Sequence, residues 1–249
     1  QWSNKTNNST QAKGRQRNAA KYYVPLPKTA SLPSGDKGPN ASCTTTAITE
    51  LTDVTVEAGA TKIKNAITAM AANGATNVPE GIVWGWRTLS SQAPFTGGRA
   101  ETERGNDKVI IVLTDGANTY YTPSSLGYSD PADSKSTYSA YGYLKPGYNG
   151  TSTPRLFMGT SGSIGQFDYS NGNYTNALNE QMAKVCANAK DSKVLVMTVA
   201  LDLNATKTAD AAQIQGLKNC SSDSRFRKDP TDASKPAKLF WNATGSNLS

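Results

Sequence analysis

Two continuous aliphatic runs stand out in a chain that is otherwise rich in Ser, Thr, Asn and Gly. The first spans Val109 to Leu113 and is followed by Thr-Asp-Gly, and the second spans Val194 to Leu201. An uninterrupted apolar run of this length is typical of a central parallel strand that is covered on both faces. We therefore predict that 109–114 and 194–201 are neighbouring buried strands of one parallel sheet.

Around these runs, apolar residues recur three or four positions apart, which predicts helices. The expected helices cover about 56–73, a segment that begins near Pro79, 174–190 and 208–219, and a short last strand covers 238–241. Strands that alternate with helices indicate a Rossmann-like, doubly wound, mainly parallel α/β sheet. The residues expected on the buried helix faces are Ala60, Ile63, Ile67, Met70, Ile82, Val83, Trp86, Leu89, Leu178, Met182, Val185, Ala189, Ile214 and Leu217.

Two helix boundaries carry their own signals. Gly74 is a natural C-terminal stop for the first helix. Either Thr76 or Asn77 can cap the second helix, and Pro79 suits its first turn.

Two stretches lack any periodicity. Residues 1–42 are polar and contain four prolines, so we expect an extended or partly ordered segment. Residues 118–173 form a long insertion that holds most of the chain's 11 tyrosines, and loops of this length are usually functional. Its rings either pack on their own backbone or form a recognition surface, because Tyr with Ser, Gly and Asn is also the composition of antibody paratopes. The candidate contact residues are Tyr120, Tyr121, Tyr138, Tyr141 and Tyr143.

The composition narrows the class of protein. A chain of 249 residues with 37% hydrophobic residues is long enough for one domain with insertions. Its net charge of +7 is mostly scattered and no nucleic-acid motif accompanies it, so we do not predict a nucleic-acid partner. No stretch approaches the roughly 18 apolar residues of a membrane span.

The chain contains no histidine. This excludes Ser-His-Asp and Cys-His catalysis as well as His-ligated zinc. The three cysteines lack the C-x-x-C spacing of a zinc knuckle, and the sequence contains neither a nucleophile motif nor a phosphate-binding loop. We therefore expect a binding protein and not an enzyme.

The segment GATNVPEGIVWGWRTLSSQAPF at 74–95, followed by KVIIVLTDGANTY at 108–120, resembles the von Willebrand factor A-type (VWA) domain of TadG-like proteins. These proteins serve pilus assembly in the bacterial tight-adherence (Tad) system. YSAYGY at 138–143 and the part from the Cys186 helix through VLVMTVALDL to LFWNATGSNL are also similar. The resemblance spans residues 43–249, which would form a partial VWA-like domain.

VWA domains carry a metal-ion-dependent adhesion site built from an Asp-x-Ser-x-Ser loop, a Thr on a second loop and an Asp that ends a strand. By resemblance, Thr76 matches the second element and Asp115 the third, and both offer hard oxygen ligands for Mg²⁺ or Mn²⁺. The plain alternatives are a helix cap for Thr76 and a turn-capping Asp for Asp115.

The first element of that site is missing from this sequence: no Asp-x-Ser-x-Ser follows an aliphatic strand. The resemblance places it, together with the first strand, before Gln1 or in a companion chain. We therefore expect metal binding by this chain alone to be weak or absent.

The resemblance implies an adhesion or assembly module that binds a protein partner of the pilus, the cell envelope or a host surface. The alternative is a metal-independent scaffold of the same machinery. The expected location is the periplasm or cell surface, with a membrane anchor in the full-length protein. Disulfides persist there, and the two helices that flank 194–201 can lie side by side, so we predict a Cys186–Cys220 bond with Cys43 unpaired or bonded elsewhere.

Overall fold

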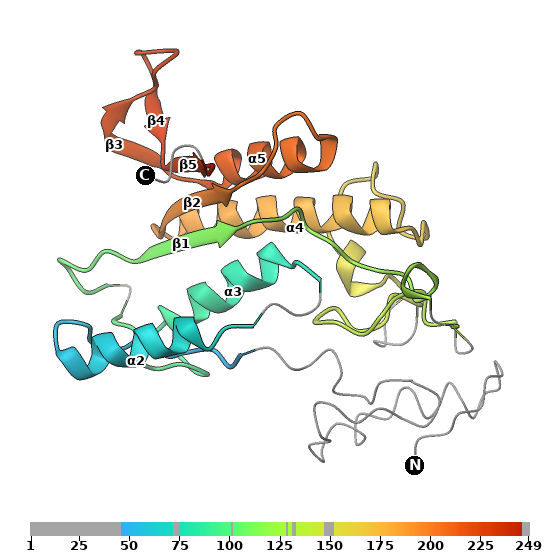
Figure 1. Cartoon of the computed structure of the whole chain (residues 1–249), viewed down its shortest axis with the longest axis horizontal. Helices are drawn as coiled ribbons and strands as arrows, with labels where there is room; N and C mark the ends of the chain where they lie inside the picture. Colours follow the sequence, from blue (N-terminus) through green and yellow to red (C-terminus); the bar gives the residue numbers. More distant parts are fainter. Residues whose placement is uncertain are drawn as a thin grey trace.

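The computed structural model describes residues 46–71, 75–100, 102–127, 129–130, 133–146 and 152–245. The predicted segment 1–42 lies outside these residues. Figure 1 shows strands alternating with helices along the chain. In order, the elements are α2 (Glu57–Thr68), α3 (Val78–Thr88), β1 (Val109–Thr114), η2 (Ser124–Leu126), η3 (Arg155–Phe157), α4 (Asn171–Asp191), β2 (Leu195–Leu201), α5 (Thr208–Cys220), β3 (Asp223–Lys228), β4 (Pro236–Lys238) and β5 (Phe240–Ala243).

The main sheet has the strand order β1-β2-β5, and both strand pairs are parallel. β1 pairs with β2 from Val109 opposite Leu195 to Thr114 opposite Ala200. The two aliphatic runs are therefore neighbouring parallel strands, as predicted, and the chain is an α/β protein.

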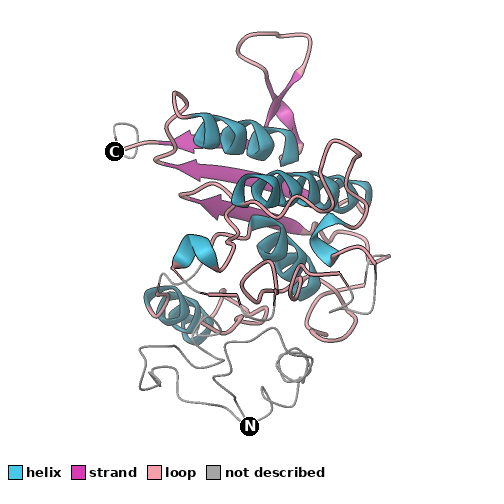
Figure 2. Ribbon diagram, turned by 90° about the vertical axis from the view of Figure 1, so that its right-hand side faces the viewer, coloured by secondary structure: helices cyan, strands magenta, loops and turns pink. Residues whose placement is uncertain are grey.

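One face of this sheet carries the main core. Figure 2 shows α3, α4 and α5 lying over the same side of the three strands. The alternate side chains of β1 and β2 point into these helices because successive residues of a strand face opposite sides. The buried residues of this core are Val78, Ile82, Ile110, Val112, Met182, Cys186, Ala189, Val194, Val196, Ala200, Leu203, Leu217 and Cys220.

The other face of β1 is open, which corrects the prediction that this strand is covered on both sides. Ile111 is 66% exposed and Leu113 is 65% exposed. Within the described part of the chain, β1 has a strand neighbour only in β2, and no helix covers these two side chains. An apolar run shows that a strand suits burial, but other elements must supply the cover.

α2 is shorter than predicted and ends at Thr68. Its expected buried face is largely in solvent, since Ile67 is 59% exposed and Met70, just beyond the helix, is 67% exposed. The predicted stop at Gly74 lies outside the described residues. The apolar residues of α2 therefore do recur at helical spacing. Within the described chain, however, α2 lacks a surface against which its apolar side could pack.

α3 begins after Asn77, whose side chain accepts a hydrogen bond from Glu80 N at 3.1 Å. Of the two candidate caps, Asn77 is the one used, and the helix-cap alternative for Thr76 is wrong. Pro79 lies in the first turn, where its missing N–H removes no helix bond. The side chains of this helix that pack in or against the core are Val78, Ile82, Trp86 and Leu89.

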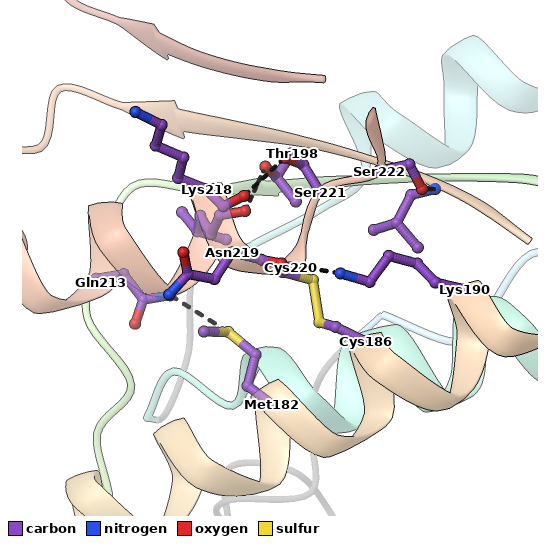
Figure 3. Close-up of a disulfide and its surroundings, with 12 residues drawn as sticks. Met182, Cys186, Lys190, Thr198, Gln213, Lys218, Asn219, Cys220, Ser221 and Ser222 are labelled. Atoms are coloured by element: carbon purple, nitrogen blue, oxygen red, sulfur yellow. Dashed lines mark hydrogen bonds between the residues drawn. A yellow bond between two sulfur atoms is a disulfide. The ribbon is translucent and has the colours of Figure 1, made fainter. Parts of the chain in front are cut away.

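α4 and α5 lie side by side and are joined by a disulfide between Cys186 and Cys220 (Figure 3). The two Cα atoms are 5.1 Å apart, and the pair is the one expected from the sequence. Both helices cover the same face of the sheet, which allows the bond. Lys190, one turn further along α4, donates to the Asn219 carbonyl at 2.9 Å. Cys43 lies outside the described residues.

After α5 the chain forms an antiparallel hairpin of β3 and β4 that the sequence did not predict. The hairpin is mostly exposed, with Phe226 at 95%, and it gives no hydrophobic alternation to detect. The last parallel strand, β5, covers 240–243 instead of the predicted 238–241. Lys238, the first residue of that predicted strand, is the last residue of β4.

The insertion 118–173 has a small core of its own. Tyr120 and Tyr174 lie with ring centroids 5.4 Å apart, and Phe157 contacts Tyr174 at 6.1 Å. This cluster rests on the N-terminal half of α4, so the insertion is anchored on the domain. The buried members are Tyr120, Leu144, Leu156, Phe157, Tyr174, Ala177 and Leu178.

Candidate functional site

Asp115 directly follows β1 at the carboxyl end of the sheet and is exposed. The turn after the strand is closed by Thr114, whose Oγ1 donates to the Gly116 carbonyl at 3.0 Å and accepts from Gly116 N at 3.3 Å. Ligands of open parallel sheets bind beyond this edge. Asp115 therefore lies where a ligand of this fold class is expected.

The loop that carries Thr76 is fastened to the loop that follows Asp115. Thr76 N donates to Thr119 Oγ1 at 2.8 Å, and Thr119 N donates to the Thr76 carbonyl at 2.9 Å. A Cβ placed on Gly116 would lie 3.6 Å from Thr76 Oγ1. The structure thus brings the Thr76 hydroxyl next to the residue that follows Asp115, although 39 positions separate Thr76 from Asp115 in the sequence.

Asn118 is the buried centre that holds this edge together. Its Oδ1 accepts from Val78 N at 2.9 Å, and its Nδ2 donates to Asn179 Oδ1 at 2.8 Å. Its backbone N donates to Gln213 Oε1 at 3.3 Å, and its carbonyl accepts from Thr175 Oγ1 at 3.1 Å. Through these hydrogen bonds, one loop residue connects the site to α3, α4 and α5. A buried polar group that is fully hydrogen-bonded can hold neighbouring elements in a fixed arrangement.

Sequence reasoning did not single out Asn118 or Gln213, which are each 1% exposed. A polar residue amid apolar positions of a helix, as Gln213 is in α5, can signal a buried hydrogen bond. Asn118 carries no comparable signal because a loop asparagine is ordinary.

Asp202 directly follows β2, at the same edge of the sheet as Asp115. Its backbone is in the left-handed region, with φ of 53°. Its Oδ1 accepts from Gly245 N at 2.8 Å, and its own N–H donates to the Ala243 carbonyl at 2.8 Å. This carboxylate therefore secures the end of β5.

The donor set at this edge falls short of what a hard divalent cation requires. Thr76 and Asp115 supply one hydroxyl and one carboxylate. Across the described residues there is no group of three or more His, Cys, Asp or Glu side chains that could hold a metal. Mg²⁺ takes six oxygens in octahedral geometry and is often held by more than one carboxylate. The residues at this edge alone do not fit such an ion.

The candidate tyrosines divide into a buried one and more accessible ones. Tyr120 is 4% exposed, so its interpretation as a surface contact is wrong. Its hydroxyl donates to the Gly142 carbonyl at 3.0 Å and accepts from Ser139 Oγ at 2.7 Å. Burial raises the pKa of the Tyr120 phenol to about 12. It is a structural residue that folds the insertion back on itself.

Tyr138 and Tyr143 pack edge to face with ring centroids 5.3 Å apart, and Tyr138 is exposed. Tyr121, Tyr141 and Tyr143 are half-buried. Burial raises the pKa of Tyr141, with the Glu80 carboxylate as a further cause. Of the five candidate tyrosines, these four remain accessible to a partner.

Within the described ranges, no helix combines the length and the apolar character needed to cross a bilayer. Comparisons with protein-family models, with curated proteins and with solved structures found no match to this chain.

Proposed function

We propose that this chain is a non-enzymatic binding module of VWA type, which contacts a protein partner at the carboxyl edge of its parallel sheet. The observation that carries the proposal is the pairing of the Thr76 loop with the loop after Asp115. It gathers an exposed carboxylate and a hydroxyl at the edge where open parallel sheets bind ligands. The resemblance to TadG-like proteins supports an adhesion or assembly role in a Tad-type pilus system outside the cytoplasm.

The site also has a rigid support. Asn118 binds α3, α4 and α5 from beneath the loop, and the disulfide joins α4 to α5. Binding sites gain affinity when their residues are held in place before the partner arrives. The buried network therefore suits a recognition surface at this edge.

In this proposal, Thr76 and Asp115 would be two of the ligands of a Mg²⁺ or Mn²⁺ ion, with the remaining oxygens supplied from outside the described residues. Such an ion would supply a positive charge that attracts a carboxylate of the partner.

The second candidate is a metal-independent scaffold of the same machinery. Two observations favour it: the incomplete donor set, and the packing of Tyr120 and Tyr174 into a core of their own. In this alternative the partner contacts the accessible tyrosines and the Asp115 carboxylate has no role.

A photo-crosslinking residue at Ala117 tests the proposal in cells that make the protein. We expect a crosslinked adduct that Asp115→Ala abolishes and that a chelator weakens. Asp107→Ala is the matched control, because Asp107 is an exposed carboxylate just before the amino end of the same strand. An adduct that Asp115→Ala leaves unchanged would refute the role of this edge, and a chelator-insensitive adduct at the Tyr138 position would support the scaffold.

A further inference from the structure

A cavity of about 440 Å³ lies at the amino end of the parallel sheet, where the starts of β1 and β2 meet the β3–β4 hairpin. Figure 1 shows the hairpin projecting from the end of the molecule at which these two strands begin. The cavity is separate from the candidate site. Lys108 lines the cavity and directly precedes β1, whereas Asp115 directly follows the same strand.

Cations outnumber anions in the lining of this cavity. Its charged residues are Lys108, Lys190, Lys193, Arg225, Asp107 and Asp223. Asp223 is already paired with Lys238, whose Nζ lies 2.7 Å from its Oδ1. Within the described ranges, Lys193 and Arg225 form no ion pair. Burial lowers the pKa of Lys190, and the ammonium group of Lys238 lowers it further. The cavity therefore carries positive charge that an anion would neutralise.

An exposed aromatic side chain accompanies this positive charge. Phe226 belongs to the lining of the cavity, yet it is 95% exposed. Its strand is held in place by Arg227, whose guanidinium carbon lies 5.0 Å from the ring centroid of Trp241. The same guanidinium donates to the Lys238 carbonyl at 3.2 Å, and Ser224 Oγ accepts from Phe226 N at 3.2 Å. An ordered hairpin therefore presents Phe226 to the solvent.

The residues at this end favour an anionic lipid surface over a protein partner. Lysine is depleted in protein–protein interfaces, but Lys190 and Lys193 line the cavity and Lys228 ends the exposed strand β3. Anionic lipids attract Lys and Arg, and an aromatic side chain flanked by cations can enter the interfacial layer of a bilayer. A bilayer also needs no preformed pocket to receive Phe226, which has almost all of its surface in solvent.

We propose that the β3–β4 hairpin and the adjoining cationic cavity dock on a bilayer surface that contains anionic phospholipids. Phe226 enters the interfacial layer, and a lipid phosphate occupies the cavity beside Lys193 and Arg225. Because the cavity and Asp115 lie at opposite ends of β1, docking leaves the carboxyl edge of the sheet free to meet a partner. The proposal rests on the hairpin and the cavity and does not depend on the function proposed for Asp115.

The test measures co-sedimentation of the 249-residue chain with vesicles of phosphatidylglycerol and phosphatidylcholine in equal parts. We expect binding at least about tenfold tighter than to pure phosphatidylcholine, and weaker as salt screens the charges. Phe226→Ala should weaken the binding by about tenfold, because the burial of an aromatic ring is lost. The control Phe167→Ala, at a 63% exposed position of the insertion, should leave it unchanged.

Two double charge reversals separate the hairpin from the rest of the basic chain. Arg225→Glu with Lys228→Glu should weaken vesicle binding by at least about tenfold, since each cation near an anionic bilayer contributes a factor of about five. Arg15→Glu with Arg17→Glu changes the net charge by the same amount and should retain most of the binding. An equal or greater loss in this second variant would overturn the proposal, because net charge and not the hairpin would then be responsible.

Fluorescence measures whether the hairpin enters the bilayer. Lipids brominated in their acyl chains should quench the indole introduced by Phe226→Trp but not the one introduced by Phe167→Trp, and the 4 native tryptophans give both variants the same background. Equal sedimentation with pure phosphatidylcholine, or equal quenching in the two variants, would overturn the proposal. A fluorescence change of Phe226→Trp with oligoglutamate but not with vesicles would also overturn it, because the hairpin would then bind an acidic polypeptide.

Discussion

Thr76 and Thr119 hold each other through two hydrogen bonds, one from Thr76 N to Thr119 Oγ1 at 2.8 Å and one from Thr119 N to the Thr76 carbonyl at 2.9 Å. One loop precedes α3 and the other follows β1. This pair is the reason that Thr76 lies beside the turn that carries Asp115. The geometry of the candidate site therefore depends on a residue that would never act as a ligand itself.

Thr119→Val should destabilise the protein by about 1 kcal/mol, because it leaves the half-buried Thr76 N–H without its acceptor. Urea unfolding followed by circular dichroism measures the change. Thr119→Ser keeps the hydroxyl and should retain most of the stability. A loss in Thr119→Ser that exceeds the loss in Thr119→Val would show that packing of the methyl group, and not the hydrogen bond, joins the loops.

Asn118→Leu should cost roughly 2–4 kcal/mol, since it leaves the buried Val78 N–H without its acceptor and removes the side-chain hydrogen bond to Asn179. Asn188→Leu is the matched control on an exposed position of α4 and should change stability by less than about 0.5 kcal/mol. A loss below about 1 kcal/mol in Asn118→Leu would contradict the central role of this residue.

Tyr120 makes stability depend on alkaline pH. Its phenol has a pKa of about 12 in the folded protein, against 10.0 ordinarily, because burial penalises the phenolate. The unfolded chain loses this proton first, so the stabilisation is complete below pH 10 and is lost as the pH rises toward 12. It amounts to about 2–3 kcal/mol.

Tyr120→Phe should be less stable at pH 8 by about 1–2 kcal/mol, because the partners of the hydroxyl lose their hydrogen bonds. The gap to the wild type should narrow between pH 9 and 11.5 in urea titrations, as only the wild type carries this group. A gap that stays constant over that range would show that the phenol is not shielded from solvent.

Reduction of the Cys186–Cys220 disulfide should lower the free energy of unfolding by about 3–4 kcal/mol, given the sequence separation of 34. The variant Cys186→Ala, Cys220→Ala should match the reduced wild type. Peptide mapping without reductant should recover the two cysteines in one linked pair. Alkylation of both thiols in the native, unreduced protein would rule out the bond.

Calorimetry on this chain alone should detect no micromolar binding of Mg²⁺ or Mn²⁺, since Thr76 and Asp115 supply too few oxygens. Micromolar affinity that disappears in Asp115→Ala, but persists in the control Asp107→Ala, would show that further ligands lie within these 249 residues.

Much of the fold could be predicted from the sequence because its signals are local. The aliphatic runs at 109–114 and 194–201 identified two adjacent parallel strands, and the spacing in α4 identified its buried face. The proximity of Cys186 and Cys220 followed from two helices that flank one strand. Thr76 and Asp115 entered through resemblance, and the structure places their loops together.

Other properties were decided only by the tertiary structure. The composition of VIIVLT suits burial on both faces, yet Ile111 and Leu113 remain exposed, because cover depends on elements elsewhere and not on the strand. Tyr120 and Tyr138 belong to one Tyr-rich segment, but only Tyr120 is enclosed, by Tyr174 from α4 and by carbonyl groups of its own insertion. Sequence pattern specifies which side chains can be buried, whereas packing between distant elements determines which of them are.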